Sequence, residues 1–248
     1  MDSKVTESFK KDFLVIKEKG WVPSNRMHDT GIGKTFEDLM GIVENNNLLA
    51  DYKEVLELKS SREIAQSMIT LFTDAPTYPK KINSLLREKY GQKDAEFGVK
   101  IIHSTFSAVK FNSFIEKFGF KLEVDEHNEK IFIKIKDLQS GKLDELDIYY
   151  TFEDLKEIIE KKCKYIAYIK TQSKKEDGKE FFKFNKAVLL SGLTFKKFID
   201  SVKNGFIVYD IRLGVYRSGK NKGKPHDHGS GFRVSKNNLN KVFNIEEI

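Results

Sequence analysis

The segment of residues 120–138 constrains the fold most strongly, because hydrophobic and polar residues alternate on both sides of a polar turn at 126–129. A period of two is typical of half-buried strands, and two such arms around a short polar turn predict a β-hairpin. The chain is therefore expected to be rich in β-structure. Other stretches with the pattern of strands lie at 55–59, 164–171, 179–190, 206–216 and 231–235.

Helices are expected between these strands, so the predicted fold class is mixed α/β. One helix is predicted to begin at Thr35, which could cap it, with Asp38 at the capping-box distance. Its apolar face would consist of Phe36, Leu39, Met40 and Val43. The remaining helices are predicted at 5–19, 61–71, 151–162 and 195–202, and turn-rich loops at 21–33 and 73–81.

The charge balance favours a polyanionic partner. The 248 residues include 44 Lys and Arg against 37 Asp and Glu, a formal net charge of +7. Such an excess fits nucleic acid, although it can also reflect an ordinary solvated surface. Cys163 is the single cysteine, which excludes an intramolecular disulfide and a multi-cysteine zinc site. No apolar stretch approaches the length of a membrane span, so we expect a soluble, cytoplasmic protein.

The segment 51–60, DYKEVLELKS, carries the residues with the clearest chemical meaning. In a strand, Glu57 and Lys59 share one face, and Asp51 lies where a bend can bring its carboxylate beside Glu57. Two carboxylates suit Mg²⁺, and a nearby ammonium can orient an attacking water. Glu37, on the helix predicted from Thr35, could add a third carboxylate. The alternative is a chance grouping, because 33% of the residues are charged.

The stretch 209–235 is basic and rich in glycine. Arginines held on strands can pair with guanine edges, whereas lysines in a mobile loop would only hold phosphates, and both readings stay open. His226 and His228 are too few ligands for a metal site on their own. The basic residues are Arg212, Arg217, Lys220, Lys222, Lys224, His226, His228 and Arg233.

These two regions, with several others in the same order, resemble the MvaI/BcnI family of type II restriction endonucleases, relatives of the mismatch-repair nickase MutH. The spacing between Asp51 and Glu57 is one residue longer than in a close family member and one shorter than in the nickase. The resembling segments are 30–41, 51–59, 70–79, 85–91, 164–169 and 210–233.

The resemblance implies a monomeric, Mg²⁺-dependent enzyme with a PD-(D/E)xK core, which cuts double-stranded DNA at five-base-pair sites of the form CC-N-GG and leaves 5′-phosphates. It implies a mainly catalytic lobe at 1–110 and a mainly DNA-recognition lobe at 111–248, and a cognate DNA methyltransferase in the same system. A strand-nicking enzyme and a catalytically silent DNA-binding module are the alternatives. The implied catalytic residues are Glu37, Asp51, Glu57 and Lys59, with Asp51 and Glu57 as metal ligands. The implied DNA-binding residues are Arg212, Tyr216, Arg217, His226, His228 and Arg233.

Overall fold

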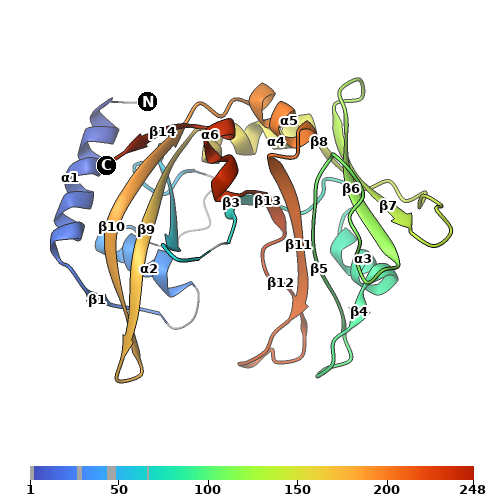
Figure 1. The fold of residues 1–248 in the computed structure, drawn as a ribbon, viewed down its shortest axis with the longest axis horizontal. Helices are drawn as coiled ribbons and strands as arrows, with labels where there is room; N and C mark the ends of the chain where they lie inside the picture. The colour runs from blue at the N-terminus through green and yellow to red at the C-terminus, as the bar shows by residue number, and fades with distance from the viewer. Residues whose placement is uncertain (1–2, 27–29, 44–48, 66) are drawn as a thin grey trace. The chain divides into compact units, whose positions relative to one another are not determined.

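The computed structural model describes residues 3–26, 30–43, 49–65 and 67–248 (Figure 1). The chain forms two compact units. Unit 1 consists of Met1–Ser67, Ile158–Thr194 and Val242–Ile248, and unit 2 of Met68–Glu157 and Phe195–Lys241. The chain passes between the units after residues 67, 157, 194 and 241, whereas the expected lobes, 1–110 and 111–248, had a single boundary. The division follows strand pairing between segments that are far apart in the sequence.

Unit 1 is built on a mixed sheet in the order β1-β10-β9-β2, with β14 paired to β10. The long strands β9 (Tyr165–Glu176) and β10 (Lys179–Ser191) form an antiparallel hairpin. Strand β2 (Glu57–Arg62) runs parallel to β9. The short strands are β1 (Val22–Pro23) and β14 (Asn244–Glu247).

Helix α1 (Ser3–Glu18) contributes much of the core of unit 1. Its buried residues Thr6, Phe9, Phe13 and Ile16 recur at helical spacing and form one face. Phe13 lies 6.4 Å, centroid to centroid, from Phe36 of helix α2. Each fully buried ring of this kind contributes about 1.5–3 kcal/mol of burial free energy. The core therefore fixes both helices against the sheet that carries β2.

Helix α2 spans Gly31–Leu39, so the prediction that it begins at Thr35 was wrong. The Thr35 hydroxyl accepts a hydrogen bond from the backbone N–H of Asn25 at 3.0 Å instead of capping a helix. The helix ends before Gly41, which has a φ of +71°. Val43 is 81% exposed and does not belong to the apolar face.

The predicted helix at 61–71 was also wrong, because β2 continues to Arg62 and β3 (Ile69–Thr73) follows in unit 2. Pairing with β9 extends the first strand, since Ser61 lies opposite Lys170. The strand pairing therefore decides this segment against its local helical pattern.

Unit 2 contains a sheet in the order β3-β13-β11-β5-β4, with β12 on β11, and a separate sheet β6-β7-β8. The first includes β4 (Gln92–Lys93), β5 (Lys100–Phe106), β11 (Ile207–Val215), β12 (Pro225–Asp227) and β13 (Gly231–Val234). The second consists of β6 (Phe118–Asp125), β7 (Lys130–Asp137) and β8 (Tyr149–Thr151).

The remaining helical segments are short. They are α3 (Ile82–Tyr90), α4 (Phe152–Ile158) with a π-helical turn (Ile159–Cys163), α5 (Phe195–Lys203), a 3₁₀ turn (Lys236–Asn238) and α6 (Leu239–Val242).

The predicted hairpin at 120–138 is confirmed as β6 and β7. Ile131, Ile133 and Ile135 are buried on one face of β7, as the alternation requires. Phe120 on β6 stacks on Phe106 of β5, which joins the two sheets of unit 2 through their apolar faces. The described residues form a mixed α/β structure with three sheets, which confirms the predicted class. Along the described ranges, no helix is both long and apolar enough to cross a membrane.

Candidate active site and nucleic-acid interface

Strand β2 places Glu57 and Lys59 on the same face of the unit 1 sheet. The Lys59 Nζ donates a hydrogen bond to Glu57 Oε1 at 2.5 Å, so the two charges form an ion pair. Leu56 and Leu58 point the other way and are buried in the core of unit 1. The period of two therefore separates a polar face from an apolar one, as predicted.

The Glu57 carboxylate is buried, with 4% of the residue exposed. Among the residues that the structure describes, its Oε2 atom has no hydrogen-bond partner, although a buried carboxylate oxygen needs a donor or a cation. Burial raises the pKa of Glu57, and the charge of Lys59 opposes this shift. Burial alone would lower the pKa of Lys59, but the charge and the hydrogen bond of Glu57, together with the charge of Asp51, outweigh it and leave that pKa raised. Each member therefore supports the ionised form of the other.

Asp51 reaches the same pair through a tight turn. Lys53 and Glu54 both have left-handed backbone angles, with φ of 50° and 58°, and the chain reverses between Tyr52 and Leu56. Asp51 Oδ2 accepts the backbone N–H of Leu58 at 3.0 Å, which ties the carboxylate to the start of β2. Its negative charge contributes to the raised pKa of Glu57. The turn thus accommodates the spacing between Asp51 and Glu57.

Glu37 lies on α2, which packs against β2, and its side chain is partly buried. The described residues nevertheless contain no group of three or more His, Cys, Asp or Glu that could hold a metal ion. The structure therefore does not bring Glu37 into a three-carboxylate set with Asp51 and Glu57.

Two neighbours of the pair come from the segment before β9 and carried no recognisable signal in the sequence. The Cys163 thiol is fully buried, and burial raises its pKa to about 12. The charge of Lys59 lowers this pKa, and the charge of Glu57 raises it. Cys163 is therefore an uncharged thiol at neutral pH. The charge of Lys162 opposes the effect of burial, which raises the pKa of Glu57. The parallel pairing of β2 with β9 brings this segment to the site.

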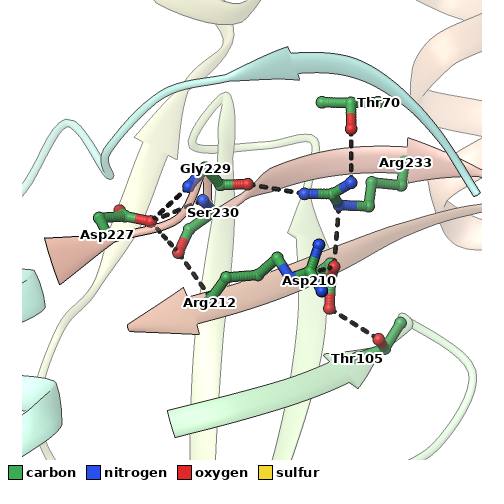
Figure 2. A network of polar contacts seen from close by, with 8 residues as sticks. All are labelled: Thr70, Thr105, Asp210, Arg212, Asp227, Gly229, Ser230 and Arg233. Carbon is green, nitrogen blue, oxygen red and sulfur yellow. Dashed lines mark hydrogen bonds and ion pairs between the residues drawn. The ribbon is translucent and has the colours of Figure 1, made fainter. Parts of the chain in front are cut away.

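In unit 2, Arg233 and Asp210 form the centre of a polar network on β13 and β11 (Figure 2). Arg233 Nε lies 2.9 Å from Asp210 Oδ2, in an ion pair whose alignment is too poor for a hydrogen bond. Nη2 donates to the Gly229 carbonyl at 2.8 Å, and Nη1 to the Thr70 hydroxyl. The Thr105 hydroxyl donates to Asp210 Oδ1 at 2.8 Å.

Arg233 is 8% exposed, and burial lowers the pKa of its guanidinium. All three guanidinium nitrogens face partners in unit 2. The arginine expected to reach toward bases from this strand is thus engaged as an internal anchor.

Asp227 organises the turn between β12 and β13 (Figure 2). Its Oδ1 accepts the backbone N–H groups of Gly229 and Ser230 at 3.0 and 2.7 Å, and the Ser230 hydroxyl at 2.8 Å. The Ser230 oxygen in turn accepts the backbone N–H of Arg212 at 2.8 Å. This glycine-rich turn is therefore held by specific hydrogen bonds.

Four of the predicted DNA-binding residues lie on one face of the sheet, either in β11 and β12 or directly after these strands. The Arg212 side chain is 47% exposed, and its Nε lies 3.5 Å from Asp210 Oδ2. The rings of Tyr216 and His226 stack at 4.0 Å, and His228 meets His226 edge-on at 4.5 Å. These side chains form a polar, aromatic surface, which we call the β11 face: Arg212, Tyr216, His226 and His228.

Arg217 is placed differently from its neighbours. Its guanidinium binds the Asp94 carboxylate through both terminal nitrogens, and Nη1 also lies 3.3 Å from Glu96 Oε2. This pairing lowers the pKa of Asp94 and raises that of Arg217. The Lys222 Nζ atom lies 3.6 Å from Glu96 Oε1. The loop between β11 and β12 is thus fastened to the turn after β4, and Arg217 serves that contact.

The MvaI/BcnI restriction endonuclease family profile matches residues 10–243 of this chain. Among solved structures, the complex of restriction endonuclease MvaI with cognate DNA substrate shares 35% sequence identity, covering 100% of this chain and 99% of the other, with a TM-score of 0.92. MvaI in the absence of DNA shares 34% identity with the same coverage and a TM-score of 0.61. None of the curated protein sequences matches the chain. The similarity therefore includes the segments of both units.

Proposed function

The chain belongs to the MvaI/BcnI restriction endonuclease family, and from this premise we propose a Mg²⁺-dependent type II enzyme that cuts both strands of duplex DNA. The proposed site is short and of the CC-N-GG form, and the products carry 5′-phosphates and 3′-hydroxyls. The proposed catalytic core is of the PD-(D/E)xK type in unit 1, and the proposed recognition lobe is unit 2.

The observation that carries this proposal is the ion pair of Glu57 and Lys59 beside Asp51. The residues fit a hard divalent cation, because Glu57 Oε2 is buried with no partner in the described part of the chain and the Asp51 carboxylate is near. Mg²⁺ prefers one or two carboxylates, together with waters and phosphate oxygens. Asp51 and Glu57 are therefore the proposed metal ligands. When bound, the ion would polarise the phosphoryl group and stabilise the leaving oxygen.

Lys59 has a separate proposed role at the same place. Its ammonium is held at a fixed position by Glu57 and is only partly exposed. A fixed ammonium can orient the attacking water and stabilise the charge that develops on the phosphate. Glu37, on α2, is proposed as a further catalytic residue that is not a metal ligand.

The β11 face supports the proposed DNA contacts of unit 2. Arg212 offers a planar set of donors suited to a guanine edge. His226 and His228 add ring nitrogens, and Tyr216 adds a hydroxyl. MvaI has been crystallised with its cognate DNA substrate. Arg233 and Arg217 are proposed to hold this surface in shape, through Asp210 and Asp94.

The enzyme is proposed to act as a monomer in the cytoplasm. A DNA methyltransferase of the same specificity is the expected partner gene product, because an unprotected host genome would be cut at every such site.

The experiment that tests the proposal is digestion of a supercoiled plasmid of known sequence in Mg²⁺, followed by sequencing of the ends. We expect linear products with ends at one repeated sequence of the CC-N-GG form, and no cleavage in a chelator. Accumulation of open circles only would instead identify a strand-nicking enzyme. Specific binding without cleavage in any divalent cation would identify a silent DNA-binding module.

A further inference from the structure

His103 lies outside the residues to which sequence and resemblance assign a role. It sits on β5, directly opposite Arg212 of β11 in the antiparallel register. Opposite residues of an antiparallel pair project from the same face of the sheet. Two residues farther along β5, Thr105 contacts Asp210 on that face. His103 therefore projects from the face that carries the exposed guanidinium of Arg212.

The ring of His103 continues the row of rings on the β11 face. It meets His228 edge-on, with 6.3 Å between the ring centroids. Both rings lie over Gly214, where an added Cβ would come within 2.7 Å of the His228 ring and 3.1 Å of His103 Nε2. Glycine at this position is what lets the two imidazoles approach the strand.

The two imidazoles differ in their hydrogen bonds. His228 Nε2 lies 3.2 Å from the Val215 carbonyl, which occupies that nitrogen. Within the ranges that the structure describes, neither ring nitrogen of His103 has a hydrogen-bond partner, and the residue is exposed. Burial of part of the ring, Arg212 and His228 all lower the pKa of His103. Its imidazole is thus neutral at pH 7, with one donor and one acceptor available.

We propose that His103 is a specificity-determining residue of this enzyme, which hydrogen-bonds a base edge of the duplex beside the base contacted by Arg212. The inference rests on the proposed function, because it extends the same DNA-binding surface to a further strand. A neutral imidazole can accept from an exocyclic amine or donate to a purine N7 or O6. Its place on a strand suits base readout, because a rigid element holds the ring in one orientation.

The test compares His103→Phe and His103→Ala with the wild type on a cognate duplex and a scrambled duplex, in Ca²⁺. Phenylalanine keeps a ring against His228 but removes both nitrogens, whereas alanine removes both the ring and the nitrogens. We expect both variants to lose roughly 5- to 150-fold in affinity for the cognate duplex and little for the scrambled one, as for an unmade base contact. Lys100→Ala, on the same strand, is the control and should bind like the wild type.

Three outcomes separate the possibilities. Wild-type affinity in His103→Phe with a loss in His103→Ala would show that the ring only supports His228, which would overturn the inference. Equal losses on both duplexes would assign His103 to a phosphate and would overturn it too. If the wild type itself failed to cleave DNA or to distinguish the two duplexes, the proposed function would be wrong. Results on the His103 variants alone cannot contradict the proposed function, so the two failures are distinguishable.

Discussion

Arg233 and Asp210 lie on neighbouring strands of unit 2, with Arg233 Nε 2.9 Å from Asp210 Oδ2. Both residues are more than nine-tenths buried, and each has further polar partners, Thr70 and Gly229 for the arginine and Thr105 for the aspartate. A buried pair of this kind is costly to break, because the remaining partner stays charged in a poorly solvated place.

The first prediction is that Arg233→Ala destabilises the protein by about 3–5 kcal/mol, since the buried Asp210 carboxylate loses its nearest cation and keeps only the more distant Arg212. Binding to cognate and scrambled duplexes should fall together, because the whole β11 face loses its support. Denaturant unfolding and competition binding measure the two effects. Replacing both residues, as Arg233→Met with Asp210→Asn, should restore part of the stability. An unchanged unfolding free energy with a loss confined to cognate DNA would instead make Arg233 a base-reading residue.

The second prediction concerns Glu57 and Lys59. Glu57→Gln and Lys59→Ala should abolish Mg²⁺-dependent cleavage while specific binding in Ca²⁺ persists, because the proposed roles concern the scissile phosphate. Glu57→Gln removes a negative charge at the proposed site of the scissile phosphate, so we expect its affinity for the cognate duplex to equal or exceed that of the wild type. Plasmid cleavage and a gel-shift titration provide the measurements. Lys17→Ala, an exposed lysine on α1, is the matched control, and wild-type cleavage by either active-site variant would contradict the assignment.

The third prediction uses the pH dependence of the pair formed by Arg217 and Asp94. Its hydrogen bonds hold the pKa of Asp94 below the usual value of 3.8. The carboxylate therefore contributes stability above pH 4, and this contribution is lost as the pH falls through the lowered pKa. Arg217→Ala should melt below the wild type at pH 7, and the difference should shrink toward pH 3. A difference that stays constant over that range would mean that the ion pair contributes nothing.

The fourth prediction is a steep salt dependence of DNA binding. Each phosphate neutralised by the protein should add a slope of about −0.9 to log K against log salt concentration. Lys220 and Lys224, in the loop between β11 and β12, are candidates for such contacts, and replacing either with alanine should weaken cognate and scrambled binding alike. The slope of the affected variant should be less steep by about one unit. Affinity that does not change with salt would speak against a DNA ligand.

The fifth prediction is that Gly214→Ala weakens cognate binding with little loss of thermal stability. The added methyl group would meet the ring ends of His228 and His103, and these side chains can swing outward if His228 gives up its contact with the Val215 carbonyl. The strand itself should persist, because Gly214 does not need a left-handed backbone angle. A melting curve and a binding titration on the same sample distinguish the two effects. A large fall in melting temperature would show that the rings cannot move away.

The sequence by itself determined the features that depend on local periodicity. The period of two placed Glu57 and Lys59 on one face and Leu56 and Leu58 on the other, and it delimited the hairpin of β6 and β7. These predictions hold because the alternation of side chains across a strand follows from backbone geometry alone. The charge excess and the order of the resembling segments pointed to DNA. Both can be read from the sequence, because neither depends on contacts between distant residues.

Only the tertiary structure decided which charged groups remain exposed. Arg217 and Arg233 were indistinguishable from Arg212 in the sequence, yet Asp94 engages the first and Asp210 the second. His103 joined the β11 face only through the pairing of β5 with β11, across more than a hundred residues of chain. Whether a charged side chain faces a partner or water depends on which distant strand becomes its neighbour, and local pattern does not specify that neighbour.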